Sequence, residues 1–206
     1  MPESRTSYHH GSLRETLMEV CLDLIETEGI GAVSLRRVAR DAGVSPRAPY
    51  NHFPDRASLL AALSERGFVE LARELEAARA GAAGPVPTLV ALVRAYLGFA
   101  RARPAYFRLM FRPELSESAK GPAGHEAADA VFRIVGEVVE SCVSGQVIAE
   151  SEAEVVTIAL WGFGHGLAAL WTDGQLAKQA AALDRTADAL VDQTLALLER
   201  LLGAGR

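Results

Sequence analysis

Apolar side chains recur every three or four positions along most of this chain, which is the period of an amphipathic α-helix. The first such stripe contains Leu13, Leu17, Cys21, Leu24 and Ile25. No run alternates β-branched and polar residues as a half-buried strand would, and Ala and Leu dominate the apolar positions. The pattern therefore predicts an all-α protein of about nine helices.

Two short amphipathic segments separated by a glycine follow the first helix. Ser34 is a typical N-cap for a helix over residues 35–42, and Gly43 stands where a left-handed turn residue is needed. A further short helix is expected from Ser45 to Phe53. Two short helices joined by a tight glycine turn form a helix-turn-helix, whose second helix can enter the major groove of DNA.

A proline interrupts the regular pattern within that last segment. Pro49 has no N–H to donate to the carbonyl of Ser45, and it disfavours helical backbone angles at Ala48. We therefore predict a distorted first turn in the helix that would read DNA.

The C-terminal two-thirds of the chain begins after a long helix that starts at Asp55 or Ser58. Two glycines and two prolines in residues 80–88 end that helix. Beyond them the apolar spacing predicts helices near 86–103, just after Pro104, and near 122–144, 152–172 and 184–202.

The distribution of charge differs between residues 34–56 and the rest of the chain. The whole chain is acidic, with a net charge of −5 and a pI near 5.6. Residues 34–56 contain five arginines and two aspartates, which gives a local charge of +3. Such a concentration suits the neutralisation of DNA phosphates, although a solvated arginine-rich helix face has the same composition.

Residues 29–63, GIGAVSLRRVARDAGVSPRAPYNHFPDRASLLAAL, resemble the DNA-binding domain of TetR-family regulators. The matching elements are the Tyr50–Phe53 ending, the Asp55–Arg56 helix start and the Leu59–Leu60 pair. The resemblance is dense over residues 8–68. It implies a helix-turn-helix domain followed by a helical domain for effector binding and dimerisation, which we place at residues 1–58 and 59–206.

The same resemblance implies roles for individual side chains. Arg36 matches a position that reaches a base or a phosphate, and Tyr50 and His52 match phosphate-contacting positions, as does Arg56. Arg47 is our candidate for reading a guanine, because its guanidinium fork fits O6 and N7. Tyr50 could instead be a core aromatic. The predicted DNA-binding residues are Arg36, Ser45, Pro46, Arg47, Tyr50, His52 and Arg56.

Residues 161–174, WGFGHGLAALWTDG, resemble a TetR-type C-terminal domain that is named for its Trp-His-Gly signature, here Trp161, His165 and Gly166. Trp161 and His165 are four residues apart and should stack on one helix face. None of the five histidines has the spacing of a metal-binding pair, so we expect no metal site and no cofactor.

The last two long helices are apolar, low in charge and rich in small residues, as expected for a homodimer interface. Two helix-turn-helix units would then lie about 34 Å apart and bind a palindromic operator. A hydrophobic small-molecule effector could bind in an apolar pocket, although the same side chains could form a dry core. The candidate pocket residues are Phe99, Tyr106, Met110, Phe132, Trp161 and His165.

The location of the protein follows from its apolar and cysteine content. Residues 155–172 carry no charged side chain, but three glycines and a histidine favour a buried or interface helix over a membrane span. Cys21 and Cys142 are expected to be buried free thiols, which indicates a cytoplasmic protein without membrane partners.

Together these features predict a DNA-binding transcriptional regulator, a repressor released by a small-molecule effector, rather than an enzyme. An activator or an effector-independent DNA binder is the alternative within the same class. An all-helical enzyme or interaction module is the alternative from another class.

Overall fold

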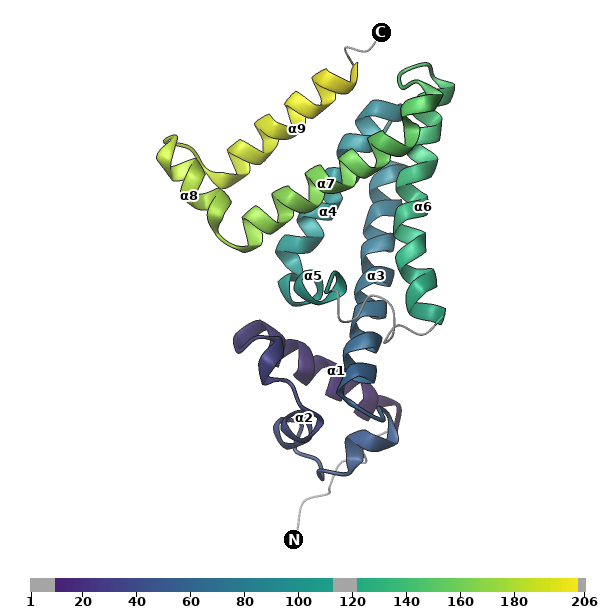
Figure 1. Cartoon of the computed structure of the whole chain (residues 1–206). Helices are drawn as coiled ribbons and strands as arrows, with labels where there is room; N and C mark the ends of the chain where they lie inside the picture. The colour runs from purple at the N-terminus through teal and green to yellow at the C-terminus, as the bar shows by residue number, and fades with distance from the viewer. Residues whose placement is uncertain (1–9, 113–121, 204–206) are drawn as a thin grey trace. The chain divides into compact units, whose positions relative to one another are not determined.

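The computed structural model describes residues 10–112 and 122–203, and within these ranges it contains helices and no strand (Figure 1). The all-α prediction is confirmed. The nine α-helices are α1 (His10–Thr27), α2 (Leu35–Asp41), α3 (Arg56–Gly81), α4 (Pro85–Ala102), α5 (Pro104–Met110), α6 (Pro122–Ser144), α7 (Ala153–Thr172), α8 (Gln175–Ala182) and α9 (Ala187–Gly203). In the described ranges, short 3₁₀ helices cover Ile30–Ala32 (η1), Ala48–Asn51 (η2) and Glu150–Glu152 (η4).

The number of α-helices agrees with the prediction, but the set differs by one exchange. The predicted α-helix from Ser45 to Phe53 is a 3₁₀ helix of four residues instead. The sequence pattern also missed α8, a short helix that follows the left-handed residue Gly174 (φ +71°) and connects α7 to α9 (Figure 1). Eight residues are too few for a clear apolar period.

The chain forms two compact units, and the long helix α3 contributes to both. Among the described residues, the first unit comprises residues 10–66 together with 105–112 and 122–124, and the second comprises residues 67–104 and 125–203. The predicted domain boundary at residue 58 stays a prediction.

The first unit is held together by a small apolar core. Leu17 and Cys21 of α1 and Val38 of α2 are fully buried, as is Leu59 of α3. Phe53, which follows η2, is only 1% exposed. These are the inward positions of the predicted stripes, and their burial supplies most of the stability of such a unit.

The second unit is organised around α4, which contacts both α7 and α9. Gly164 of α7 faces α4: an added Cβ would lie 3.7 Å from Val93 and 3.8 Å from Tyr96, which are ordinary van der Waals distances. The Tyr96 hydroxyl lies 2.8 Å from Nδ1 of His165. Burial lowers the pKa of His165, which favours the neutral ring. The Nδ1 atom of a neutral ring can accept a hydrogen bond from the Tyr96 hydroxyl.

Helix α7 is apolar but largely uncovered. The stretch Glu150–Thr172 is long and apolar enough to cross a membrane by length and composition, and 22% of its most apolar window is buried. Interface helices of soluble proteins pass the same test. Cys21 and Cys142 are buried free thiols, as predicted, and burial raises the pKa of Cys21 to about 12.

Candidate nucleic-acid interface

The helix-turn-helix begins with a well-capped α2. The Ser34 side chain accepts a hydrogen bond from the N–H of Arg37 at 3.2 Å, which confirms Ser34 as the N-cap. Gly43 has a φ of +70°, the left-handed conformation that the sequence pattern requires there. The N–H of Val44 then donates to the carbonyl of Ala39 at 2.9 Å, which turns the chain tightly after α2.

The segment that follows the turn is irregular, as the proline predicts. The amide of Ala48 donates to Ser45, that of Tyr50 to Arg47 and that of His52 to Pro49, so three-residue bonds dominate. Pro49 cannot donate, and it disfavours α-helical angles at the residue before it. Residues 45–53, which we call the reading segment, therefore form a turn and a 3₁₀ helix rather than an α-helix.

Side chains of this segment divide between an anchored and an exposed side. Pro49 and Phe53 are buried, and the guanidinium carbon of Arg14 lies 5.2 Å from the centre of the Phe53 ring. Tyr50 is 50% exposed, so it is not the core aromatic of the alternative interpretation. Ser45, Pro46 and Arg47 are also exposed, and His52 is half-buried.

Two basic side chains of α2 are occupied by acidic partners. Arg37 donates to both carboxylate oxygens of Glu28 and, through Nε, to Asp41 at 2.5 Å. Arg40 donates to the other oxygen of Asp41 at 3.1 Å. Hydrogen bonds from these two arginines, chiefly Arg37, hold the pKa of Asp41 below its usual range. Arg37 therefore fastens α2 to the end of α1 rather than extending toward a ligand.

Arg56, predicted to contact a phosphate, has partners within the protein. Its Nε donates to the carbonyl of Val33 at 2.9 Å, and its Nη2 donates to the carbonyl of Ile30 at 2.7 Å. The neighbouring Asp55 caps α3 by accepting hydrogen bonds from the N–H and the hydroxyl of Ser58, which lower the pKa of Asp55.

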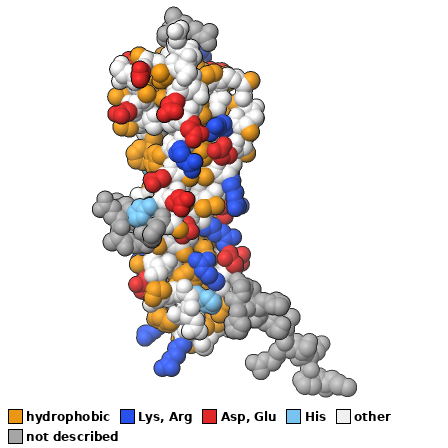
Figure 2. Space-filling model, turned by 90° about the vertical axis from the view of Figure 1, so that its right-hand side faces the viewer, with side chains coloured by type: hydrophobic (Ala, Val, Ile, Leu, Met, Phe, Trp, Pro, Cys, Tyr) orange, Lys and Arg blue, Asp and Glu red, His pale blue; other side chains and the backbone are white. Residues whose placement is uncertain are grey.

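Arg36 and Arg47 differ from the other arginines of this stretch. Both are exposed, and neither has a hydrogen bond or an ion pair with any residue in the ranges that the structure describes. Figure 2 shows Lys and Arg side chains projecting from the first unit at the lower edge of the view. Two exposed guanidinium groups without such partners, in the same helix-turn-helix as the exposed Tyr50, are suited to binding a polyanion.

The predicted effector-pocket residues do not form one lining. Tyr106 and Met110 belong to the first unit, and both are buried. Phe99 of α4 is fully buried in the second unit. Only Phe132, Trp161 and His165 gather: the Trp161 ring lies edge-on to Phe132 at 5.4 Å and 6.1 Å from the His165 ring, so the predicted Trp161–His165 pairing is confirmed.

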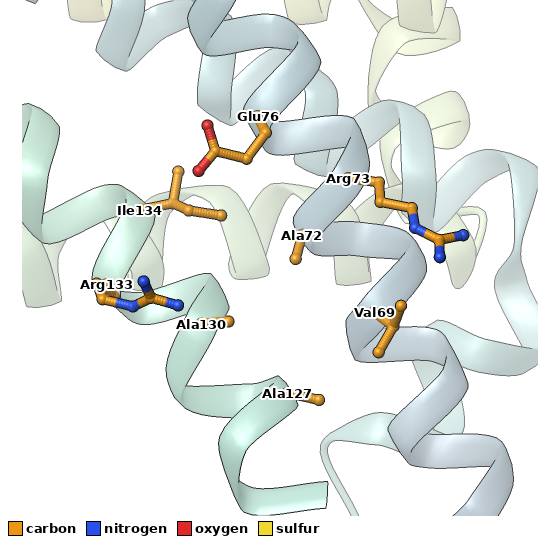
Figure 3. Close-up of a pocket in the computed structure, with 8 residues that line it drawn as sticks. All are labelled: Val69, Ala72, Arg73, Glu76, Ala127, Ala130, Arg133 and Ile134. Atoms are coloured by element: carbon orange, nitrogen blue, oxygen red, sulfur yellow. The ribbon is translucent and has the colours of Figure 1, made fainter. Parts of the chain in front are cut away.

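An open groove lies elsewhere in the second unit, between α3 and α6 (Figure 3). Its volume is about 430 Å³, and short alanine side chains on both helices create it. Figure 3 shows Arg73 directed away from α6, while Glu76 extends toward Ile134. The lining residues, none of them predicted from the sequence, are Val69, Ala72, Arg73, Glu76, Ala127, Ala130, Arg133 and Ile134.

Some of these roles left a signal in the sequence and others did not. Arg37 and Asp41 are four residues apart on one helix, a spacing that predicts an ion pair. The bonds from Arg56 to Ile30 and Val33 span 26 and 23 residues and end on backbone carbonyls, so residue types at those positions carry no trace of them.

Comparison with known protein families supports a function in DNA binding. Residues 17–63 match the family described as bacterial regulatory proteins, tetR family, and residues 89–194 match the tetracyclin repressor-like C-terminal domain. The Trp-His-Gly subgroup stays a prediction. No curated protein sequence matches the chain.

Several solved structures resemble the chain over nearly its whole length. A protein with unknown function from Rhodococcus sp. RHA1 is 32% identical, with a TM-score of 0.81 over 97% of this chain and 100% of that one. A tetR-family regulatory protein from Rhodococcus RHA1 is 18% identical, with a TM-score of 0.72 over 95% and 98%. The regulator FadR from Bacillus subtilis, in complex with stearoyl-CoA, is 13% identical, with a TM-score of 0.71 over 93% and 98%.

The two family matches together span both the helix-turn-helix and most of the C-terminal helices. Regulators of this family are soluble proteins that bind DNA as dimers and are not enzymes. The chain belongs to the TetR family and is a DNA-binding transcriptional regulator.

Proposed function

We propose that the chain is a homodimeric repressor whose two copies associate through α7 and α9. The observation that carries this proposal is a stripe of apolar and small residues along α7 that no part of residues 10–112 or 122–203 covers. Successive exposed positions of the stripe are Val155, Ile158, Ala159, Gly162, Gly166 and Leu170. Val155 and Ile158 are 68% and 66% exposed, an unusual fraction for large apolar side chains at neighbouring positions.

Two glycines in this stripe support close contact with a second helix. A Cβ added at Gly162 or Gly166 would meet no atom within 4 Å, so the packing of a single chain does not require glycine at either position. Glycine inside a helix costs about 1 kcal/mol relative to alanine. Close approach of a partner helix gives both glycines a physical role.

Helix α9 extends the same apolar surface. Leu197 and Leu201 are one helical turn apart, and they are 46% and 65% exposed. Residues of α7 and α9 from two copies can bury each other in a symmetric four-helix contact. The Arg94–Asp192 and Arg101–Asp188 ion pairs hold α9 against α4 and leave its apolar side available.

Within each copy, the first unit supplies the DNA contacts. We assign guanine reading to Arg47, and phosphate contacts to Arg36 and Tyr50, with Ser45, Pro46 and His52 completing the surface. A two-fold dimer presents two such surfaces, which implies a palindromic operator with half-sites about 34 Å apart.

The proposed effector is a hydrophobic small molecule that binds the DNA-incompetent state more tightly. The second unit offers apolar surface at the Phe132–Trp161 cluster and in the α3–α6 groove. The similarly folded FadR from Bacillus subtilis was solved with stearoyl-CoA, so acyl-CoA compounds are the first class to test.

The dimer is tested by substituting one glycine of the stripe. Gly166→Leu should convert the protein to a monomer in analytical ultracentrifugation while leaving its helical circular dichroism intact. Gly98→Leu is the matched control, because Gly98 is an exposed glycine of α4 that also has no atom within 4 Å of an added Cβ. A Gly166→Leu protein that sediments as a dimer would contradict the proposed interface.

Repression and its release are tested with DNA selected from a randomised duplex library by the wild-type protein. The selected sites should be palindromic, and they should repress a reporter promoter when placed downstream of it. Stearoyl-CoA and shorter acyl-CoA compounds are then titrated, with emission of Trp161 followed in a Trp171→Phe background. Displacement from DNA together with an emission change supports the effector. Stable DNA binding throughout the panel favours the effector-independent alternative for these compounds.

A further inference from the structure

The guanidinium of Arg56 joins the two ends of the helix-turn-helix. Arg56 is the first residue of α3 and stands three positions after Phe53, where the reading segment ends. Its two hydrogen bonds end on the carbonyls of Ile30 and Val33, in the chain that leads into α2. The segment closed by these bonds contains the whole of α2, the Gly43 turn and η2.

Both carbonyls lie at the corner between η1 and α2, outside any continuous α-helical ladder. Ile30 belongs to the short helix η1, and Val33 follows it in extended conformation (φ −73°, ψ 125°) just before the N-cap of α2. The N–H of Val33 itself donates to Ile30 at 3.3 Å, so the guanidinium adds a second, charged donor at this corner. Hydrogen bonds from charged donors are stronger than those between neutral groups.

The reading segment has few hydrogen bonds of its own. Because η2 is a 3₁₀ helix of four residues, it lacks the continuous ladder that stiffens an α-helix. Its position depends on the buried side chains of Pro49 and Phe53 at its inner side and on the chain segments at its two ends. The turn at Gly43 holds one end, and α3 with Arg56 holds the other.

We propose that Arg56 is a positioning residue for DNA recognition: it fastens the end of the reading segment to the entry of α2 and so fixes Arg47 and Tyr50 for base and phosphate contact. This inference rests on the DNA-binding function of the site. It assigns Arg56 to contacts within the protein, whereas the family resemblance assigns it to a DNA phosphate.

The two roles differ in how DNA binding responds to salt. Loss of one phosphate contact lowers the slope of log K against log salt by about 0.9, because one fewer counterion is released. Loss of a positioning contact weakens binding to the selected site and leaves that slope unchanged. Lysine preserves a phosphate contact as a point charge, but it offers one nitrogen in place of the two that reach the two carbonyls.

The experiment compares Arg56→Lys and Arg56→Gln with the wild-type full chain. The probes are a duplex selected by the wild-type protein and a random-sequence duplex of the same length. We expect both variants to bind the selected duplex roughly tenfold more weakly, with an unchanged salt slope and a smaller loss on random DNA. Arg36→Lys and Arg36→Gln are the matched comparison, for which only the glutamine variant should lower the slope.

A second readout does not involve DNA. Amide hydrogen exchange over residues 30–35 and 45–53 should accelerate in Arg56→Lys, while α9 should keep its wild-type protection. Wild-type affinity of Arg56→Lys combined with a lowered slope in Arg56→Gln would overturn the inference and restore the phosphate role. Unchanged exchange at residues 30–35 in Arg56→Lys would also overturn it. If the wild-type chain selects no DNA, the proposed DNA-binding function is wrong. The exchange measurement still shows whether Arg56 holds residues 30–35 and 45–53 together.

Discussion

The two units leave different chemistry uncovered. In the first, large apolar side chains such as Phe53 are buried, and the guanidinium groups of Arg36 and Arg47 are among the exposed groups that have no partner in the described part of the chain. In the second, the arginines of α4 are paired with α9 aspartates, and large hydrocarbon side chains such as Val155 and Ile158 are exposed.

This contrast indicates two kinds of partner. An exposed arginine is well hydrated, so its exposure to water has little cost in free energy. Its binding to a polyanion is favoured by the release of counterions. Exposed apolar side chains gain from any surface that removes them from water, and a second copy of the same stripe is self-complementary. In the proposed dimer, the same chain would use one surface for DNA and another for its second copy.

The largest expected effect comes from a charge placed in the apolar stripe. Ile158→Asp should prevent dimer formation, because an unpaired carboxylate would be buried at the contact. Since both half-sites must be bound together, affinity for a selected palindrome should fall by about 100-fold or more. Electrophoretic mobility shift with the palindrome and with a single half-site measures this. Equal affinity of wild type and variant for the palindrome would refute the link between dimerisation and operator binding.

A smaller effect is expected from the reading segment itself. Arg47→Ala should cost about 1–3 kcal/mol on the selected duplex and should relax the preference at one base pair of each half-site. Arg36→Ala should weaken binding to all duplexes alike. Binding to a set of singly substituted duplexes distinguishes the two, and an unchanged base preference in Arg47→Ala would rule out its assigned role.

The capping carboxylate at the start of α3 should make unit stability depend on pH. The pKa of Asp55 is lowered in the folded state, so its contribution is present above the ordinary aspartate pKa near 3.9 and is lost as the pH falls through the folded value. Asp55→Ala should lower Tm at pH 7 by about 2–4 °C. Asp55→Asn should keep the cap and reduce the acid sensitivity, with Asp41 supplying the part that remains. Thermal melts at pH 3 to 7 compare the three proteins.

The smallest effect on stability is expected at Pro49. Pro49→Leu restores an N–H and frees Ala48 for α-helical angles, but it also increases the entropy of the unfolded chain, so Tm should change by less than about 3 °C. The helix signal in NMR chemical shifts over residues 45–53 should rise. Shifts that stay at their wild-type pattern would mean that another constraint, rather than the proline, imposes the 3₁₀ geometry.

Most helices and the helix-turn-helix were predictable because their cause is local. The apolar period predicts α1 and α4, Ser34 predicts the start of α2, and Pro49 predicts the irregular reading segment. The candidate DNA surface was predictable only as a set of residue types. Five arginines between residues 34 and 56 look equivalent in the sequence. In the structure, however, Arg37 donates to Glu28 and Asp41, and Arg56 donates to two backbone carbonyls.

The predicted effector-pocket residues show a similar limit of prediction from the sequence. Helical spacing placed Trp161 beside His165, since both lie on one helix, but it could not assign Tyr106 and Met110 to a different unit from Phe99. The groove between α3 and α6 depends on which alanines face each other across two helices that are about fifty residues apart in the chain. No pattern within a single helix contains that information.

Periodicity, capping and proline chemistry act between neighbours along the chain, so the amino-acid order alone determines the all-α class and the distorted reading segment. The engagement of each arginine and the exposure of the α7 stripe depend on contacts between residues far apart in the chain. Those contacts arise only when the helices pack, because packing decides which donors meet an acceptor and which hydrocarbon faces stay in water. For this regulator, packing separates the arginines that hold the helix-turn-helix together, Arg37 and Arg56, from Arg36 and Arg47, which have no partner among the described residues.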